Sequence, residues 1–286
     1  GLMQIVFFQN CRGTFDKQEI KDQPVKPYKL GQPFFTLHHQ INLSSEVGDK
    51  GGYVSDIVMM DDGRLVICLP RQSRLLICNT DGSQADSIHV KGTPLFLTAV
   101  NNSTVAVTLY YSVCIEMYDI NNKLKLKSIS VPGMRYMSDI ITINNKLVLC
   151  VYNILLIIDH QTGEVVQTIQ TDCHPGRLQG SGDRIFYCNN NTLYWYSYTD
   201  DRHHTLTLPS PPSRMTTLKD GSLYVVCSDG SVQHVSSDGK QYKSVTTMGF
   251  QKLKHTLISY NSKQRKLITK HEREDNRCVF NVFYEE

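Results

Sequence analysis

The stretch VSDIVMMDDGRLVICLPRQSRLLICNTDG, residues 54–82, consists of short apolar segments separated by residues that form tight turns. Its segments RLVIC (64–68) and RLLIC (74–78) are aliphatic, and Asp-Gly pairs stand at 62–63 and 81–82. Asp-Gly pairs tolerate the positive φ angles of β-hairpin turns. The stretch therefore predicts several consecutive antiparallel strands.

One apolar tetrapeptide of this stretch recurs along the whole chain at intervals of 38 to 43 residues. Its six copies are LVIC ending at Cys68, VAVT at Thr108, LVLC at Cys150, IFYC at Cys188, YVVC at Cys227 and LITK at Lys270. About forty residues is the length of four short strands with their turns, which is one blade of a β-propeller. The repeat predicts an all-β, six-bladed β-propeller with almost no helix.

The blade boundaries follow from the repeat. We expect blades at about 55–95, 96–136, 137–176, 177–213, 214–254 and 255–286. The last copy ends after its third strand, CVFNVF (278–283), and lacks a fourth. The strand-like segment PFFTLHHQINL (33–43) precedes the first blade and is placed to supply it. An N-terminal strand that completes the last blade would close the ring and remove unpaired sheet edges.

Outside the propeller, residues 1–32 are expected to be a linker with one short strand, MQIVFF. No apolar run reaches the roughly 20 residues that a membrane-spanning helix needs. The first residues do not match a signal peptide. The nine cysteines include no C-x-x-C pair, which favours a reducing compartment and a cytoplasmic location. The net charge of +3 indicates no particular partner.

The blade pattern resembles the NHL repeat, in which an apolar strand, a turn, a second apolar strand, a short loop, a third strand, an Asp-Gly turn and a last strand follow one another. The resemblance covers residues 33–286. It is clearest in residues 54–82 and in RMTTLKDGSLYVVCSDGSVQHVSSDGK (214–240), whereas the blades at 96–136 and 177–213 lack the Asp-Gly turns. The chain is similar to the NHL-like C-terminal region of tripartite-motif (TRIM) E3 ubiquitin ligases.

This resemblance implies a non-enzymatic recognition domain that binds a protein substrate or single-stranded RNA. The full-length protein would carry a RING, B-boxes and a coiled coil before Gly1, and the coiled coil would make it oligomeric. None of those zinc modules lies in these 286 residues, so we expect the chain itself to have no ligase activity. We expect a monomeric propeller with no cofactor and no membrane association.

In a propeller, the loops between second and third strands share one face with the blade-to-blade connections. That face would collect ten basic side chains against four acidic ones, while the opposite face would hold eight against eleven. Cations interleaved with aromatic rings suit a protein segment or single-stranded nucleic acid. The candidate binding residues are Arg71, Arg74, Lys91, Tyr110, Tyr111, Arg135, Tyr136, Tyr152, Arg177, Arg214, Phe250, Lys252, Lys254, Arg273 and Arg277.

Two other interpretations stay open. Asp56 and Asp139 occupy matching starts of first strands and could hold a divalent ion in a channel-mouth hydrolase or lyase, or instead cap loop amides. The other blades offer Leu97, Leu178, Thr216 and Thr256 there, so a full ligand set is missing. The chain could also be a structural docking scaffold that uses its acidic face. The aligned cysteines belong to different blades, which favours core packing over a shared metal.

Overall fold

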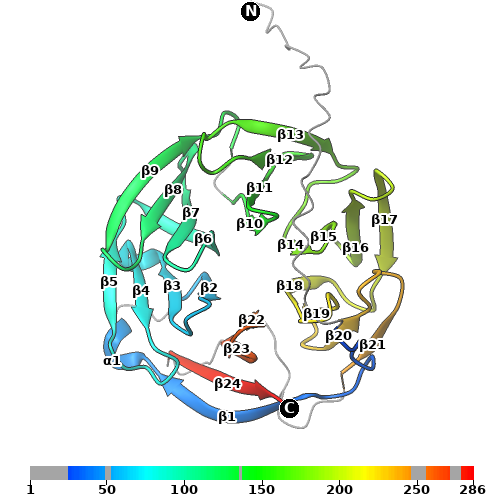
Figure 1. The fold of residues 1–286 in the computed structure, drawn as a ribbon, viewed down its shortest axis with the longest axis horizontal. Helices are drawn as coiled ribbons and strands as arrows, with labels where there is room; N and C mark the ends of the chain where they lie inside the picture. Colours follow the sequence, from blue (N-terminus) through cyan, green and yellow to red (C-terminus); the bar gives the residue numbers. More distant parts are fainter. Residues whose placement is uncertain (1–24, 49–52, 135–136, 246–255, 271–277) are drawn as a thin grey trace, which may run out of the picture.

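The chain folds as a ring of six sheets around a central axis (Figure 1). The computed structural model describes residues 25–48, 53–134, 137–245, 256–270 and 278–286. These form six four-stranded antiparallel sheets, which confirms the six-bladed β-propeller. Within these ranges the helical segments are a single turn, α1 (Ser44–Val47), and a 3-10 turn, η1 (Pro70–Gln72).

Blades 1 to 5 take their strands in chain order from the axis outwards, and the innermost strands of all six blades contact one another around the ring. Blade 1 has β2 (Asp56–Met59), β3 (Leu65–Leu69), β4 (Arg74–Cys78) and β5 (Asp86–His89). Blade 2 has β6 (Thr93–Ala99), β7 (Thr104–Tyr110), β8 (Cys114–Asp119) and β9 (Leu124–Ser130). Blade 3 has β10 (Ile140–Ile143), β11 (Lys146–Val151), β12 (Ile154–Ile158) and β13 (Val165–Gln170).

The other three blades follow the same plan. Blade 4 has β14 (Leu178–Ser181), β15 (Arg184–Asn189), β16 (Thr192–Ser197) and β17 (Arg202–Thr207). Blade 5 has β18 (Pro212–Thr217), β19 (Leu223–Cys227), β20 (Val232–Val235) and β21 (Tyr242–Ser244). Blade 6 has β22 (Leu257–Asn261), β23 (Lys266–Lys270), β24 (Val279–Glu285) and, on its outside, β1 (Phe35–Asn42).

The N-terminal strand β1 closes the ring, as the sequence predicted. It pairs antiparallel with β24, from Phe35 opposite Glu285 to Asn42 opposite Val279. Past the end of β1, the Leu43 amide donates to the Cys278 carbonyl over 2.8 Å. Blade 6 is thus built from both ends of the described chain, and the pairing of β1 with β24 closes the ring.

The hydrophobic core lies between the blades. Every residue of β3 and β19 is buried, because each second strand is covered by a neighbouring blade on both sides. Outer strands such as β9 and β13 expose most of their side chains. Six apolar clusters, one at each contact between adjacent blades, follow this arrangement around the ring. The near-continuous apolar second strands of the sequence are explained by this two-sided burial.

The hairpin turns use their aspartates and asparagines to bond the backbone. Oδ1 of Asp62, Asp81 and Asp238 each accepts the amide two residues later, at 3.0 Å or less. Backbone and hydroxyl donors hold the pKa of several turn carboxyls below its usual value. Asn144 and Asn145 both have positive φ, which asparagine tolerates better than most residues. The turn chemistry read from the sequence is therefore realised.

Residues 25–34 form a strap that docks on blades 5 and 6. The Tyr28 amide donates to Oδ2 of Asp220 over 2.9 Å, and the Tyr28 hydroxyl donates to Glu285 over 2.5 Å. The Tyr28 ring stacks on Phe34 with centroids 4.1 Å apart. Gly31 has φ +77°, and a Cβ there would lie 2.9 Å from the Cβ of Lys243. The strap therefore requires glycine at this point.

Below the strap lies a buried histidine. Nδ1 of His234 accepts the Gly31 amide over 3.3 Å, and its Nε2 lies 2.9 Å from the Ser222 hydroxyl. Burial lowers the pKa of His234 to about 4. The neutral ring is thus the form that the folded protein accepts.

We predict that Ile41→Ala lowers the free energy of unfolding by about 3 kcal/mol, because Ile41 on β1 is 2% exposed and fills the core between blades 6 and 1. The matched control is Leu37→Ala on the same strand, where the side chain is 44% exposed and the loss should stay below about 1 kcal/mol. Urea unfolding measures both. Equal losses would contradict the assignment of β1 to the core.

We also predict that acid weakens the fold through His234. Its folded pKa lies below the ordinary value of 6.5, so the unfolded chain binds the proton first as the pH falls. Stability relative to a His234→Gln variant should drop by up to about 3 kcal/mol between pH 6.5 and pH 4. Urea unfolding of both proteins across this range tests it, since other titrating groups cancel in the difference. A constant difference would show that His234 is not buried in neutral form.

Candidate functional site at the mouth of the central channel

One face of the ring carries the loops between second and third strands together with the blade-to-blade connections; we call it the loop face. Backbone bonds tie each connection to the neighbouring loop. The bonds run from Val90 to Ser73, Val131 to Val113, Thr171 to Asn153 and Leu208 to Asn191, each over 2.8 Å. The two kinds of loop therefore share a single face, as the sequence argument required.

A cavity of about 250 Å³ opens where this face meets the central channel. Its walls come from blades 1, 4, 5 and 6. The lining residues are Tyr53, Val54, Arg177, Ser213, Arg214, Leu257 and Lys270. Three of the seven are cationic and none is acidic.

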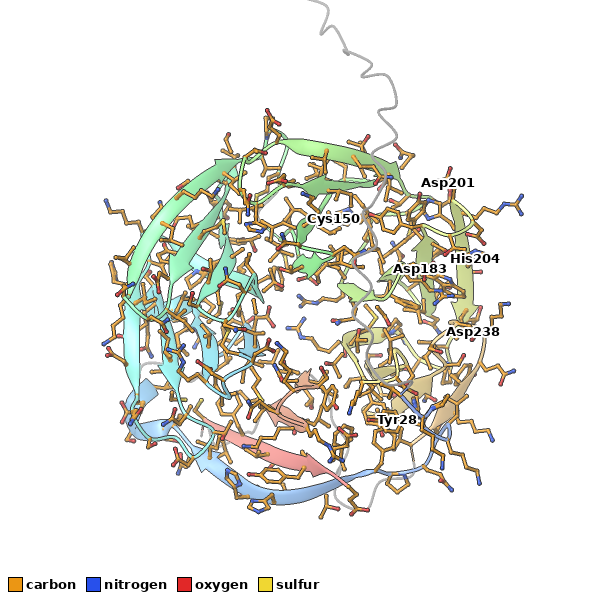
Figure 2. All side chains as sticks on the ribbon, viewed as in Figure 1. Tyr28, Cys150, Asp183, Asp201, His204 and Asp238 are labelled. Atoms are coloured by element: carbon orange, nitrogen blue, oxygen red, sulfur yellow. The ribbon has the colours of Figure 1, made fainter. Side chains whose placement is uncertain are left out.

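Two of these cations span the channel mouth. Arg177 of blade 4 places its guanidinium carbon 4.4 Å from the ring centroid of Phe96, which belongs to blade 2. Arg214 of blade 5 donates to the Ser55 carbonyl, at the start of blade 1, over 3.2 Å. In both cases a whole blade lies between the partners. Figure 2 shows nitrogen-tipped side chains that reach into the centre of the ring.

Asp56 and Asp139 each join two neighbouring blades. Oδ1 of Asp56 accepts the Ile57 amide and its Oδ2 accepts the Leu97 amide of blade 2, at 2.9 and 3.0 Å. Asp139 does the same with Ile140 and, in blade 4, Leu178, at 2.8 and 2.9 Å. Both carboxylates therefore cap amides, which is the structural interpretation that the sequence left open beside metal binding.

The two aspartates are also electrostatically unusual. Burial, with a smaller contribution from the charge of Asp139, raises the pKa of Asp56 to about 7. Burial raises the pKa of Asp139 as well, and the nearby Arg177 guanidinium opposes the shift in both. Near neutral pH the mouth of the channel thus holds fewer negative charges than its residues suggest.

The strand register places Arg177 at the position in blade 4 that Asp56 and Asp139 hold in blades 1 and 3. Asp56 lies opposite Cys68, and the equivalent partners in other blades are Phe96 opposite Thr108, Pro212 opposite Cys227 and Leu257 opposite Lys270. Arg177 directly precedes Leu178 of β14 just as Asp139 precedes Ile140 of β10. The sequence alignment placed Leu97, Leu178, Thr216 and Thr256 at this position, and that alignment was wrong, because the register places Phe96, Arg177, Pro212 and Leu257 there.

Two tyrosines of the loop face stand on strained backbone. Tyr111 has φ +61° and is 77% exposed, and Tyr152 has φ +54° and is 50% exposed. A bulky residue in this region is uncommon and costs about 1 kcal/mol or more. Asn190, with φ +49°, stands in the corresponding turn of blade 4. Tyr111 and Tyr152 thus place large rings at positions that asparagine would occupy with less strain.

The structure brings together some of the predicted binding residues. Arg177 and Arg214 share the cavity, and Arg71 lies over the Tyr53 ring at its rim, 5.8 Å from the centroid. The rings of Tyr110 and Tyr111 lie 4.0 Å apart on blade 2. Arg74 instead bonds to Gln72 and to the Glu46 carbonyl, and Lys91 is exposed on the connection after β5. The predicted residues Arg135, Tyr136, Phe250, Lys252, Lys254, Arg273 and Arg277 lie outside the described residues.

Five of the seven cavity residues were not among the sequence candidates, and two of the five have an aromatic ring or a charge. Tyr53 immediately precedes blade 1, and Lys270 ends the repeated tetrapeptide of blade 6. The signal for Lys270 was present, because LITK is the copy that ends in a cation where other blades have cysteine or threonine. Tyr53 gave no such signal.

The acidic face opposite is largely explained by turn geometry. In blade 4, Asp201 accepts the Tyr196 hydroxyl over 2.6 Å, and Asp183 accepts hydroxyls of Ser197 and Thr199 (Figure 2). His204 pairs with Asp200 over 2.8 Å. These carboxylates are already engaged by the protein itself.

The aligned cysteines lie in the core. Cys68, Cys150, Cys188 and Cys227 are all buried and unbridged, and burial raises the pKa of each thiol. Cys150 lies on the inner part of blade 3 (Figure 2). Among the residues that the structure describes, no three His, Cys, Asp or Glu side chains are placed to hold a metal ion. Nor does any helix there have the length and apolarity to cross a bilayer.

Comparison with known proteins establishes the fold and nothing finer. No family model and no curated protein matches the sequence. U3-55K superimposes with a TM-score of 0.65 at 9% identity, over 83% of this chain and 96% of that one. A streptogramin B lyase gives 0.62 at 14% identity, over 88% of each chain. Hydrazine synthase of Kuenenia stuttgartiensis gives 0.61 at 15% identity, over 78% and 74%.

We predict that Asp56 makes stability rise on mild acidification. Its folded pKa of about 7 lies above the ordinary value of 3.8, so between these values the folded protein binds more protons than the unfolded chain. Relative to an Asp56→Asn variant, the wild type should therefore gain stability as the pH falls from 7 to 4. Urea unfolding at several pH values checks this sign, which is opposite to that of His234. A loss in this range would mean that Asp56 is ionised in the folded state throughout.

Proposed function

We propose that this chain is the recognition propeller of a TRIM-type E3 ubiquitin ligase, and that it binds a protein substrate or RNA through the loop face. The binding role rests on two exposed tyrosines, Tyr111 and Tyr152, which have positive φ and lie on the same face as the cationic channel mouth. Strain held at exposed aromatic residues is typical of functional surfaces. The TRIM assignment rests on the NHL-like repeat of the sequence.

A binding role is favoured over catalysis by the state of the charged groups. The carboxylates of Asp56 and Asp139 are occupied by backbone amides, and the carboxylates in the turns bond the protein itself. The cations at the channel mouth face a cavity instead. No observation on the described residues gives the metal-dependent hydrolase or lyase, or a scaffold acting through the acidic face, better support.

The test is a crosslinking pull-down with the double variant Tyr111→Asn, Tyr152→Asn. We expect at least tenfold less partner retained, while the free energy of unfolding stays equal or rises by up to about 1 kcal/mol, because asparagine accepts positive φ. The matched control is Leu126→Asn, Val166→Asn, which changes exposed apolar residues on the outer strands and should retain the partner. Full retention by the tyrosine variant would rule out the loop face.

The salt dependence of the captured complex separates the two ligand classes. Binding of RNA should weaken steeply with salt in proportion to the phosphates contacted, whereas a mainly apolar protein contact should change little. Nuclease treatment before elution gives an independent readout. The Arg71→Glu variant should reduce the salt slope if the ligand is RNA, because one cation near the rim is lost.

A further inference from the structure

Lys270 occupies a position where the other blades place small uncharged residues. The aligned second-strand residue is a buried cysteine in four blades and Thr108 in a fifth. In blade 6 it is a lysine that is only 6% exposed and lines the channel-mouth cavity. Lysine is almost never buried to this degree unless an anion is near it.

The described part of the chain does not supply that anion. None of the ion pairs between described residues includes Lys270, Arg177 or Arg214. Among the described residues, Asp56 and Asp139, whose pKa values the Arg177 charge lowers, already accept two backbone amides each. Three cationic residues therefore line one cavity whose described walls contain no carboxylate.

The cavity has the size and walls for one acidic side chain. Its volume of about 250 Å³ is below the 300–1,000 Å³ that is typical of pockets for drug-sized ligands. The Ser213 hydroxyl donates to the Val226 carbonyl, which leaves the cations as the groups that would meet an anion. Val54 and Leu257 add apolar wall, which suits the methylene groups of a glutamate better than a hydrated phosphate. Guanidinium groups match the two oxygens of a carboxylate.

We propose that the channel-mouth cavity binds the carboxylate of an acidic side chain on a protein partner, held by Lys270, Arg177 and Arg214. This deepens the proposed function, on which it rests, by naming the chemistry of the ligand. The exposed Tyr53 at the rim and the tyrosines of blades 2 and 3 then contact the rest of the acidic segment.

The probe is a fluorescein-labelled hexaglutamate peptide, with hexaglutamine as the neutral peptide and a ten-nucleotide oligouridylate as the phosphate ligand. Binding is followed by fluorescence anisotropy. We expect Lys270→Met to weaken hexaglutamate binding at least tenfold. The control is Lys266→Met on the same strand, which removes an equal charge outside the cavity and should change binding less than twofold.

A stability measurement distinguishes loss of binding from misfolding of the variant. Without peptide, the Tm of Lys270→Met should equal or exceed that of the wild type, because methionine replaces a buried charge at a position that other blades fill with cysteine. Hexaglutamate should raise the wild-type Tm and leave the Tm of Lys270→Met unchanged. A lower Tm for Lys270→Met without peptide would show a structural role and overturn the proposal.

Three further results would overturn it: no binding of hexaglutamate, equal binding by Lys270→Met, or Lys270-dependent binding of oligouridylate alone. These outcomes are separable from failure of the proposed function. If the tyrosine variant loses its captured partner while hexaglutamate does not bind, the loop face stands and the carboxylate site falls. If hexaglutamate binds through Lys270 while the tyrosine variant retains its partner, the carboxylate site stands and the role of the two tyrosines in partner binding falls.

Discussion

The structure depends on the pairing of β1 with β24. All six inter-blade cores are equivalent in kind, and each needs a blade on both sides to bury its second strands. Because blade 6 takes its outer strand from near the start of the chain, the cores on both sides of it include residues of β1, Phe35 on one side and Ile41 on the other. Stability of the propeller is therefore a property of the circle and not of single blades.

The fold was predictable because the repeat is visible in types of residue that have one physical reason to recur. Burial on both faces requires uninterrupted apolar second strands, and tight hairpins favour Asp-Gly or Asn-Asn. Both signals therefore recur along the sequence. Ring closure was readable from the missing fourth strand. The strap at 25–34 was not, because Tyr28 and Gly31 act through contacts with residues some two hundred positions away.

The site was predictable only in part. Loop-face membership follows from topology, so Arg177 and Arg214 were found from their place in the repeat. Their contacts across the channel, with Phe96 and with the Ser55 carbonyl, join blades that are not adjacent, and a repeat read from sequence does not show such contacts. For Lys270 the sequence showed the departure from the repeat, but it did not show that the side chain is buried.

The strap, residues 25–34, ties the start of the described chain to one side of the ring. Tyr28 bonds Asp220 in the turn between β18 and β19, and Glu285 at the end of β24, both on the side away from the loop face. No strap residue lines the channel-mouth cavity, which opens on the opposite side of the ring.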